Sequence, residues 1–164
     1  ETGDAETKQY FAKNLNLAVE YAAKCGVNLG FETMETPFMD TVGKAMQYVD
    51  AVNSAWLGVY PDIGNLKNAA VLYQSDLAQD LERGNGHIFA AHLKETKPGV
   101  YRDMDFGTGH TEYQTCLVSL LRMNVRMFTG EFWYQKGQDY QKTICRSAEF
   151  LRSQIERAMG AAWI

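Results

Sequence analysis

The stretch Gly86-His87-Ile88-Phe89-Ala90-Ala91-His92-Leu93-Lys94-Glu95-Thr96 predicts a short buried strand that ends on two ionisable side chains. Side chains alternate between the two faces of a strand, so His92 and Lys94 share one face and Leu93 lies on the other. A histidine and a lysine at the exit of an apolar strand need polar partners, because burying such groups unpaired is costly. Those partners must come from other segments of the chain.

Three other apolar segments each end on an acidic residue. Glu32 follows residues 27–31, Asp62 follows residues 55–61, and Glu131 follows residues 125–130. Together with His92, these residues place one potential metal ligand near the exit of each of four strands. The regular spacing predicts a repeated strand–helix unit with its ionisable groups at one end.

Helical periodicity of apolar residues separates the strands. Residues 62–65 have a turn composition, and Thr111 has the residue type of an N-cap. Strands that alternate with helices favour a parallel sheet. The predicted architecture is α/β, written α(βα)₄ with four parallel strands, and its helices span about 6–25, 37–52, 73–83, 111–123 and 138–159.

Small residues occur at one depth on the faces that carry the ionisable groups, namely Gly30, Gly58, Ala90 and Thr129. Large apolar residues occupy the opposite faces, which suits a barrel interior beside a site. A complete (β/α)₈ barrel takes about 250 residues, so 164 residues supply half of its strands. Two strand edges would then be open, and open edges favour pairing with another chain. Either the other half lies outside this polypeptide or two copies complete a structure between them.

Composition and charge narrow the classes of partner. Hydrophobic residues make up 46% of the chain, charged residues 22%, and the formal net charge is −4, which gives no reason to expect nucleic acid or an anionic membrane as a partner. No apolar run approaches the roughly 18 residues that span a bilayer. Cys25, Cys116 and Cys145 form no close pair, which fits reduced thiols and a cytoplasmic location.

The active site of such a barrel lies at the carboxyl ends of the strands, where Glu32, Asp62, His92 and Glu131 would converge. Three carboxylates and an imidazole favour one divalent ion, either Mn²⁺, Mg²⁺, Co²⁺ or Zn²⁺. With the ion bound, an adjacent carbonyl and hydroxyl would be polarised, which stabilises the enediolate formed when a carbon-bound proton leaves. Glu32 and Glu131 could reach the reacting carbon from opposite faces, one taking the proton and the other returning it.

Four motifs occur in order. They are Gly30-Phe31-Glu32-Thr33-Met34 with Thr36-Pro37-Phe38-Met39, then Val59-Tyr60-Pro61-Asp62-Ile63-Gly64-Asn65-Leu66, Ala91-His92-Leu93-Lys94-Glu95-Thr96, and Tyr101-Arg102-Asp103 with Phe106-Gly107-Thr108-Gly109. From about residue 10 onward the chain resembles the L-ribulose-5-phosphate 3-epimerase family, whose members are also named L-xylulose-5-phosphate 3-epimerases or hexulose-6-phosphate isomerases. That family belongs to the xylose-isomerase-like TIM barrels.

The resemblance implies that residues 1–164 form a single domain, the C-terminal half of the barrel, with the family's first four strands absent. It implies metal-dependent epimerisation at C3 of a pentulose 5-phosphate, either L-ribulose 5-phosphate or L-xylulose 5-phosphate, through an enediolate. Glu32, Asp62, His92 and Glu131 would be the metal ligands, and Glu32 and Glu131 the acid/base pair. Gly130-Glu131-Phe132-Trp133 differs from the family's usual Glu-Met-Trp but keeps the glutamate.

Three further residues are weaker candidates for substrate binding. Arg102 lies in the long loop after the third strand, Lys94 points the same way as His92, and Trp133 follows Glu131. Alternatives remain open: an aldose–ketose isomerase acting on hexulose 6-phosphate, or an inactive half-barrel that dimerises through its open edges. A metal-dependent endonuclease is disfavoured, because only one of three histidines is well placed and the balance of charge is acidic.

Overall fold

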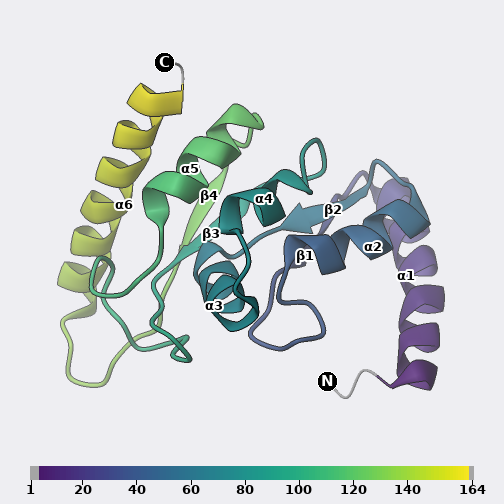
Figure 1. The fold of residues 1–164 in the computed structure, drawn as a ribbon, viewed down its shortest axis with the longest axis horizontal. Coiled ribbons are helices and arrows are strands. Elements are labelled where there is room, and N and C mark those ends of the chain that lie inside the picture. The colour runs from purple at the N-terminus through teal and green to yellow at the C-terminus, as the bar shows by residue number, and fades with distance from the viewer. Residues whose placement is uncertain (1–3, 163–164) are drawn as a thin grey trace.

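The computed structural model describes residues 4–162, in which parallel strands alternate with helices as predicted. Helices α1 and α6 stand at opposite ends of the molecule, with the strands and the other helices between them (Figure 1). The strands are β1 (Leu29–Glu32), β2 (Leu57–Tyr60), β3 (Ala91–Lys94) and β4 (Phe128–Glu131). The helices are α1 (Ala5–Cys25), α2 (Val42–Val52), α3 (Ile63–Tyr73), α4 (Leu77–Glu82), α5 (Tyr113–Arg122) and α6 (Tyr140–Ala162).

The four strands pair in parallel and in chain order. β1 pairs with β2, bringing Gly30 opposite Gly58, and β3 pairs with β4, bringing Lys94 opposite Glu131. Two isolated parallel bridges, Val59 with Ile88 and Asp62 with His92, connect the two pairs. Within residues 4–162, β1 and β4 each have a partner on one side only, so both outer edges are open as predicted.

The strand face opposite the ionisable residues packs under helices. Leu57, Val59 and Leu93 are each 0–1% exposed and belong to the same apolar core as the helices α2, α3 and α5. On β1, the ring of Phe31 lies 6.1 Å from that of Phe11 in α1. This burial orients the strands, because turning one over would expose its large apolar side chains to water.

The small residues on the inner face include one that tolerates no side chain. A Cβ atom on Gly58 would lie 2.3 Å from the carbonyl oxygen of His87, so the backbone of the segment that leads into β3 passes directly over it. Gly30 and Thr129 on the same face are exposed, which is the arrangement expected of a barrel interior opened along its length. The prediction of small residues inside and large ones outside is confirmed.

Local signals account for the ends of the first two helices. The side chain of Asp4 accepts the Thr7 N–H at 2.7 Å at the start of α1, and Gly26 ends the helix with a φ of +68°. Thr41 caps α2 in the same way as Asp4 caps α1. The predicted helix from about residue 37 therefore begins five residues later, after a turn at Thr36–Met39.

The interpretation of residues 62–65 as a turn is wrong. Asp62 is the N-cap of α3, its Oδ1 accepts the Asn65 N–H at 2.8 Å, and the helix runs to Tyr73. The helix predicted at 73–83 is the shorter α4, which begins after a cap at Asp76. Aspartate, glycine and asparagine are typical of both turns and helix starts, and that ambiguity caused the error.

Thr111 does not cap α5. The N-cap is Glu112, which makes no side-chain capping bond. The Thr111 hydroxyl instead donates to the Lys94 carbonyl at 2.9 Å, fastening the end of β3 to the start of α5. The remaining predicted elements match within three residues at either end, except that β3 begins at Ala91 and residues 86–90 only bridge to β2.

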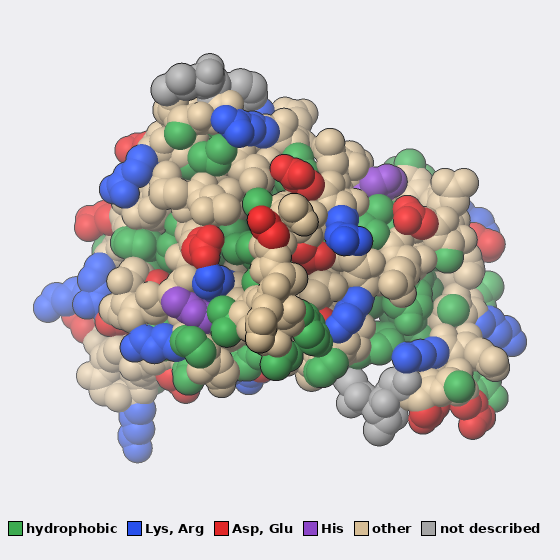
Figure 2. All heavy atoms as spheres, viewed as in Figure 1, with side chains coloured by type: hydrophobic (Ala, Val, Ile, Leu, Met, Phe, Trp, Pro, Cys, Tyr) green, Lys and Arg blue, Asp and Glu red, His purple; other side chains and the backbone are tan. Residues whose placement is uncertain are grey.

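Figure 2 shows one face of the molecule with its side chains coloured by type. Acidic and basic side chains are interspersed there, with hydrophobic side chains between them (Figure 2). Between residues 4 and 162 there is no helix with the length and hydropathy needed to cross a membrane.

Candidate metal centre

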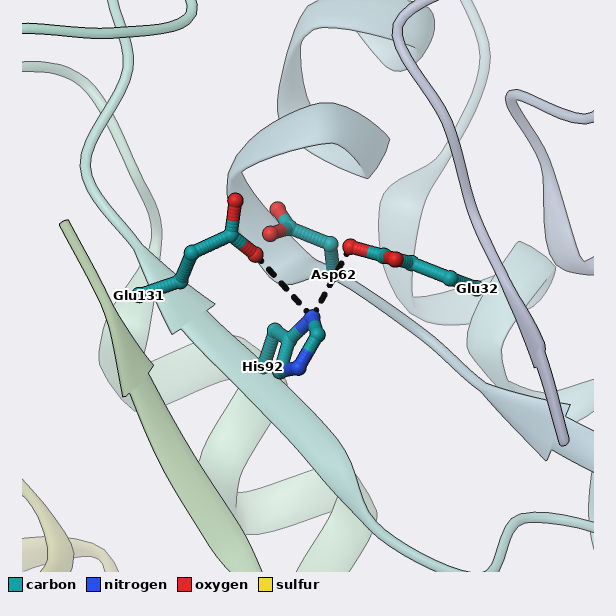
Figure 3. A group of neighbouring side chains, drawn as sticks. All are labelled: Glu32, Asp62, His92 and Glu131. Carbon is teal, nitrogen blue, oxygen red and sulfur yellow. Dashed lines mark hydrogen bonds and ion pairs between the residues drawn. The ribbon is translucent and has the colours of Figure 1, made fainter. Parts of the chain in front are cut away.

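Four elements bring Glu32, Asp62, His92 and Glu131 together. Glu32 and Glu131 are the last residues of β1 and β4, Asp62 lies between β2 and α3, and His92 lies within β3. One potential ligand atom from each side chain lies within 4.8 Å of the other three. Figure 3 shows the three carboxylates directed toward one another and toward the imidazole. The predicted convergence of the four side chains is therefore present.

The imidazole of His92 presents Nδ1 to the cluster. This nitrogen lies 2.9 Å from Oε1 of Glu32 and 3.0 Å from Oε2 of Glu131 (Figure 3). The Tyr60 ring lies 4.6 Å from the His92 ring, and the Tyr60 hydroxyl is 2.7 Å from Oγ1 of Thr129 on β4. Tyr60 thus supports the imidazole from the inner face of the strands.

Asp62 is held by a short chain of buried polar contacts. Its backbone N–H donates to the hydroxyl oxygen of Thr33 at 2.9 Å, and the Asn65 amide donates to the Thr33 carbonyl at 2.9 Å. Since Oδ1 caps α3, the orientation of the carboxylate is set and Oδ2 remains for the cluster. Sequence reasoning missed Thr33 and Asn65; the available signal was Asp62, since aspartate is a preferred N-cap residue.

Charge and burial perturb the acidity of three of these groups. The hydrogen bond to Glu131 raises the pKa of His92 against the smaller opposing effect of burial, and the charge of Glu32 raises it further. Burial raises the pKa of Asp62 to about 8, against the opposing attraction of Lys94. The contact with His92 lowers the pKa of Glu131 to about 2. Perturbed acidities in one cluster are typical of functional sites.

The cluster suits a divalent cation. The buried Oδ2 of Asp62 has no hydrogen-bond partner among residues 4–162. Within that range, Oε2 of Glu131 lies near one nitrogen only, Nδ1 of His92, and that nitrogen also contacts Glu32. Buried oxygens without donors are costly in a protein interior, and a cation among them removes that cost. Three carboxylate oxygens and one imidazole nitrogen form a donor set common to Mn²⁺, Mg²⁺, Co²⁺ and Zn²⁺.

The three weaker candidates lie beside the cluster. The Lys94 ammonium nitrogen is 3.3 Å from Oε1 of Glu131 and 4.8 Å from the centre of the Trp133 ring. The guanidinium of Arg102 lies 5.2 Å from the same ring centre, and its Nε is 3.1 Å from Oε1 of Glu35. The side chain of Lys94 is 2% exposed and that of Arg102 is 58% exposed, so Arg102 is open to a ligand in solution.

Glu35 is a residue of this region that the sequence did not indicate. Its Oε1 contacts both Arg102 and Lys94, the latter at 3.3 Å, and therefore connects the loop after β3 to the cluster. The residue lies in the turn after β1, where an acidic side chain is ordinarily solvated. Glu35 pairs with Arg102, which lies 67 residues further along the chain, and no local sequence pattern predicts such a contact.

The long loop after β3 is anchored at its base. The buried carboxylate of Glu95 accepts backbone N–H groups from Gly107 at 2.5 Å and from Thr111 at 3.2 Å. The Gly-x-Gly turn at 107–109 resembles an anion-binding motif, but its Gly107 N–H already donates to the carboxylate of Glu95 in the same chain. Asn68 in α3 pairs with the backbone of Gly99 and Val100 in the same loop. The loop holds Arg102 near the cluster through these contacts.

The chain is similar to known proteins of one family. A family model described as the xylose isomerase-like TIM barrel matches residues 1–154. L-ribulose-5-phosphate 3-epimerase UlaE of Shigella boydii serotype 18 is 31% identical over 154 residues, which are 93% of this chain and 53% of that protein. The chain thus spans about half the length of the curated relatives that it matches.

Solved structures share the fold at lower identity. A structure of L-ribulose 3-epimerase superposes with a TM-score of 0.77 at 15% identity, over 99% of this chain and 58% of the other. D-allulose 3-epimerase from Methylomonas sp. in complex with D-allulose gives 0.69 at 15% identity, over 94% and 57%. The alternating α/β chain with four parallel strands therefore corresponds to about half of a TIM barrel. The chain belongs to the xylose isomerase-like TIM barrel family, and over 93% of its length it is homologous to about half of the L-ribulose-5-phosphate 3-epimerase UlaE.

Proposed function

We propose that residues 1–164 are a single domain, the C-terminal half of a metal-dependent 3-epimerase of pentulose 5-phosphates such as L-ribulose 5-phosphate or L-xylulose 5-phosphate. The observation that carries this proposal is the convergence of Glu32, Asp62, His92 and Glu131 within 4.8 Å on the inner face of the strands. The 31% identity to L-ribulose-5-phosphate 3-epimerase UlaE supports the choice of substrate.

In this proposal all four residues hold one divalent ion, and Glu32 and Glu131 also move protons. A bound ion would polarise the carbonyl and hydroxyl oxygens of the substrate and so acidify the carbon-bound hydrogen between them. Glu32 and Glu131 come from the two outermost strands and meet His92 at 2.9 and 3.0 Å. Carboxylates on two sides of a substrate can remove a proton from one face and return it on the other, which inverts the carbon.

Arg102, Lys94 and Trp133 are the proposed substrate contacts. The exposed guanidinium of Arg102 suits a phosphate or hydroxyl group, since guanidinium forms charge-assisted bonds to such oxygens. The Trp133 ring contacts both the Lys94 ammonium and the Arg102 guanidinium, and it would form a wall of the sugar pocket. The Lys94 side chain is buried beside Glu131, so Lys94 would contact a substrate oxygen only where that oxygen approaches Glu131.

The open edges of β1 and β4 are the proposed sites of association, either with a second copy or with another polypeptide that completes the barrel. Light scattering coupled to gel filtration measures this directly. A dimer or larger assembly is expected, and a monomer at micromolar concentration would show that the edges need no partner. The proposed location is the cytoplasm, where sugar phosphates and reduced thiols both occur.

The first test is the metal content of the purified chain, measured by plasma mass spectrometry after supplying Mn²⁺ or Zn²⁺. About one ion per chain is expected, with loss of the ion in Glu131→Gln and in His92→Ala. The exposed residues Glu82 and His87 provide matched controls, Glu82→Gln and His87→Ala, which should keep the ion. A chain without metal under all conditions would refute the proposed centre.

Substrate assays then separate the reactions. Epimerisation of L-ribulose 5-phosphate or L-xylulose 5-phosphate, abolished by Glu32→Gln and by Glu131→Gln, is the expected result. Interconversion of an aldose with hexulose 6-phosphate would identify an isomerase on the same site. A metal-loaded chain that turns over neither class would be an inactive half-barrel.

A further inference from the structure

A buried ammonium group lies against the proposed metal centre. The Lys94 nitrogen is 3.3 Å from Oε1 of Glu131 and 4.0 Å from Oδ2 of Asp62, the oxygen that has no hydrogen-bond donor. The Lys94 side chain is only 2% exposed, and Trp133 covers it at 4.8 Å. Solvent screening is weak at such a position, so the charge of Lys94 acts strongly on its neighbours.

The charges of the centre balance only when Lys94 is included. Glu32, Asp62 and Glu131 carry three negative charges when all are ionised, and His92 can bind a metal only as the neutral imidazole. A divalent ion would compensate two of those charges and the ammonium of Lys94 the third. Excess charge in a partly buried site is costly, so this neutrality favours one divalent ion and disfavours a second.

A second carboxylate limits the effect of Lys94. Oε1 of Glu35 lies 3.3 Å from the Lys94 nitrogen and 3.1 Å from Nε of Arg102, so Glu35 shares its charge between the two cations. Glu35 is not among the four clustered ligands, and its side chain is 25% exposed. The positive potential that Lys94 adds to the centre is therefore partly offset by the carboxylate of Glu35.

We infer that Lys94 is the fixed countercharge of the metal centre and that its positive charge lowers the affinity for the divalent ion. Glu35 partly offsets that charge and so sets how far the affinity is lowered. This inference rests on the metal centre proposed above. Lys94 acts here as a positioning residue through Glu131 and Asp62, and no ligand atom is contributed by Lys94 or Glu35.

The inference predicts opposite effects for two substitutions. Lys94→Met removes the charge and keeps the length of the side chain, so Mn²⁺ should bind about tenfold more tightly, because a nearby cation no longer repels the ion. Glu35→Gln removes the carboxylate that offsets Lys94, so Mn²⁺ should bind about threefold or more weakly. Lys94→Arg keeps the charge and should bind with nearly the affinity of the unaltered chain.

The test is isothermal titration of the full chain and its variants with MnCl₂, each variant first shown to be folded by circular dichroism. Lys44→Met is the matched control, since Lys44 also pairs with a carboxylate, Asp40, but lies outside the cluster. Its affinity should be unchanged. A purely structural role for Lys94 would weaken binding in Lys94→Met, which is opposite in sign to the expected result.

Binding by Lys94→Met that is equal to or weaker than that of the unaltered chain would overturn the inference while leaving the metal centre intact. If Lys94→Met does not fold, Glu35→Gln decides, and unchanged or tighter binding there overturns it. Absence of Mn²⁺ binding in the unaltered chain would instead refute the metal centre itself, and the inference with it.

Discussion

The loop after β3 depends on one buried carboxylate, and removing it provides a quantitative test of the structure. Glu95 is 4% exposed, and Oε2 accepts the Gly107 N–H while Oε1 accepts those of Thr96 and Thr111. The Thr96 N–H has a second acceptor, the Thr111 hydroxyl oxygen, at 3.1 Å. Glu95→Ala therefore removes the acceptor of two backbone donors, Gly107 and Thr111, and leaves the third partly satisfied.

The expected loss follows from these two donors. A hydrogen bond to a charged group contributes about 1.5–3 kcal/mol, and the burial cost of the carboxylate, which disappears with it, offsets part of the sum. The net loss in the free energy of unfolding for Glu95→Ala should be about 3 kcal/mol. For a chain of this size, that corresponds to a fall of about 6–12 °C in the unfolding midpoint.

The assay is urea unfolding followed by circular dichroism, combined with hydrogen exchange of residues 97–111. Glu95→Ala should speed the exchange of the loop amides as well as lower the stability. Asp105→Ala is the matched control on the same loop, because it removes only the partly exposed ion pair with Arg146 and should cost less than about 1 kcal/mol. If Glu95→Ala stays within about 1 kcal/mol of the unaltered chain, with the loop still protected, then the Glu95 contacts do not anchor the loop and the reasoning fails.

Three further predictions test other parts of the fold. Gly58→Ala should lower the free energy of unfolding by about 2 kcal/mol or more, since its Cβ would lie 2.3 Å from a backbone carbonyl oxygen that cannot move independently; thermal unfolding checks this, and an unchanged midpoint would contradict the strand packing. Burial raises the pKa of the Cys116 thiol, so a thiol reagent at pH 8 should modify the exposed Cys25 and Cys145 rapidly and Cys116 only on unfolding; rapid modification of all three would contradict the core. With a chelator present, burial raises the pKa of Asp62 to about 8 in the folded chain. The stability that protonated Asp62 contributes is therefore complete below its ordinary pKa of 3.8 and is lost as the pH rises through about 8. Asp62→Asn should make the free energy of unfolding, measured by urea titration, depend less steeply on pH in this range, and an unchanged pH dependence would contradict the prediction.

Much of the architecture follows from local patterns. Alternation of apolar strands and amphipathic helices predicts parallel pairing, and the position of small residues along each strand predicts which face lines the barrel interior. An ionisable residue near the exit of each strand then predicts the cluster, because parallel strands bring their carboxyl ends to one edge. The convergence of Glu32, Asp62, His92 and Glu131 could therefore be predicted without coordinates.

Local patterns failed where one residue type serves two structures. The aspartate, glycine and asparagine of residues 62–65 suit a turn as well as a helix start, and only the packing of α3 under β3 selects the helix. At Thr111 the predicted N-cap is used for another bond, because the Lys94 carbonyl at the end of β3 lies within reach of its hydroxyl. In both places a contact from a distant part of the chain decides the outcome.

The sequence by itself determined the alternation of parallel strands with helices, the inward and outward faces of the strands, and the four residues of the candidate metal centre, but not helix α3. Only the tertiary structure decided that Lys94 is buried against Glu131, that Glu35 joins it to Arg102, and that Glu95 anchors the loop. The physical reason is range: periodicity and strand exits are properties of neighbouring residues, whereas a charge pair depends on distances between segments that meet only in the folded chain.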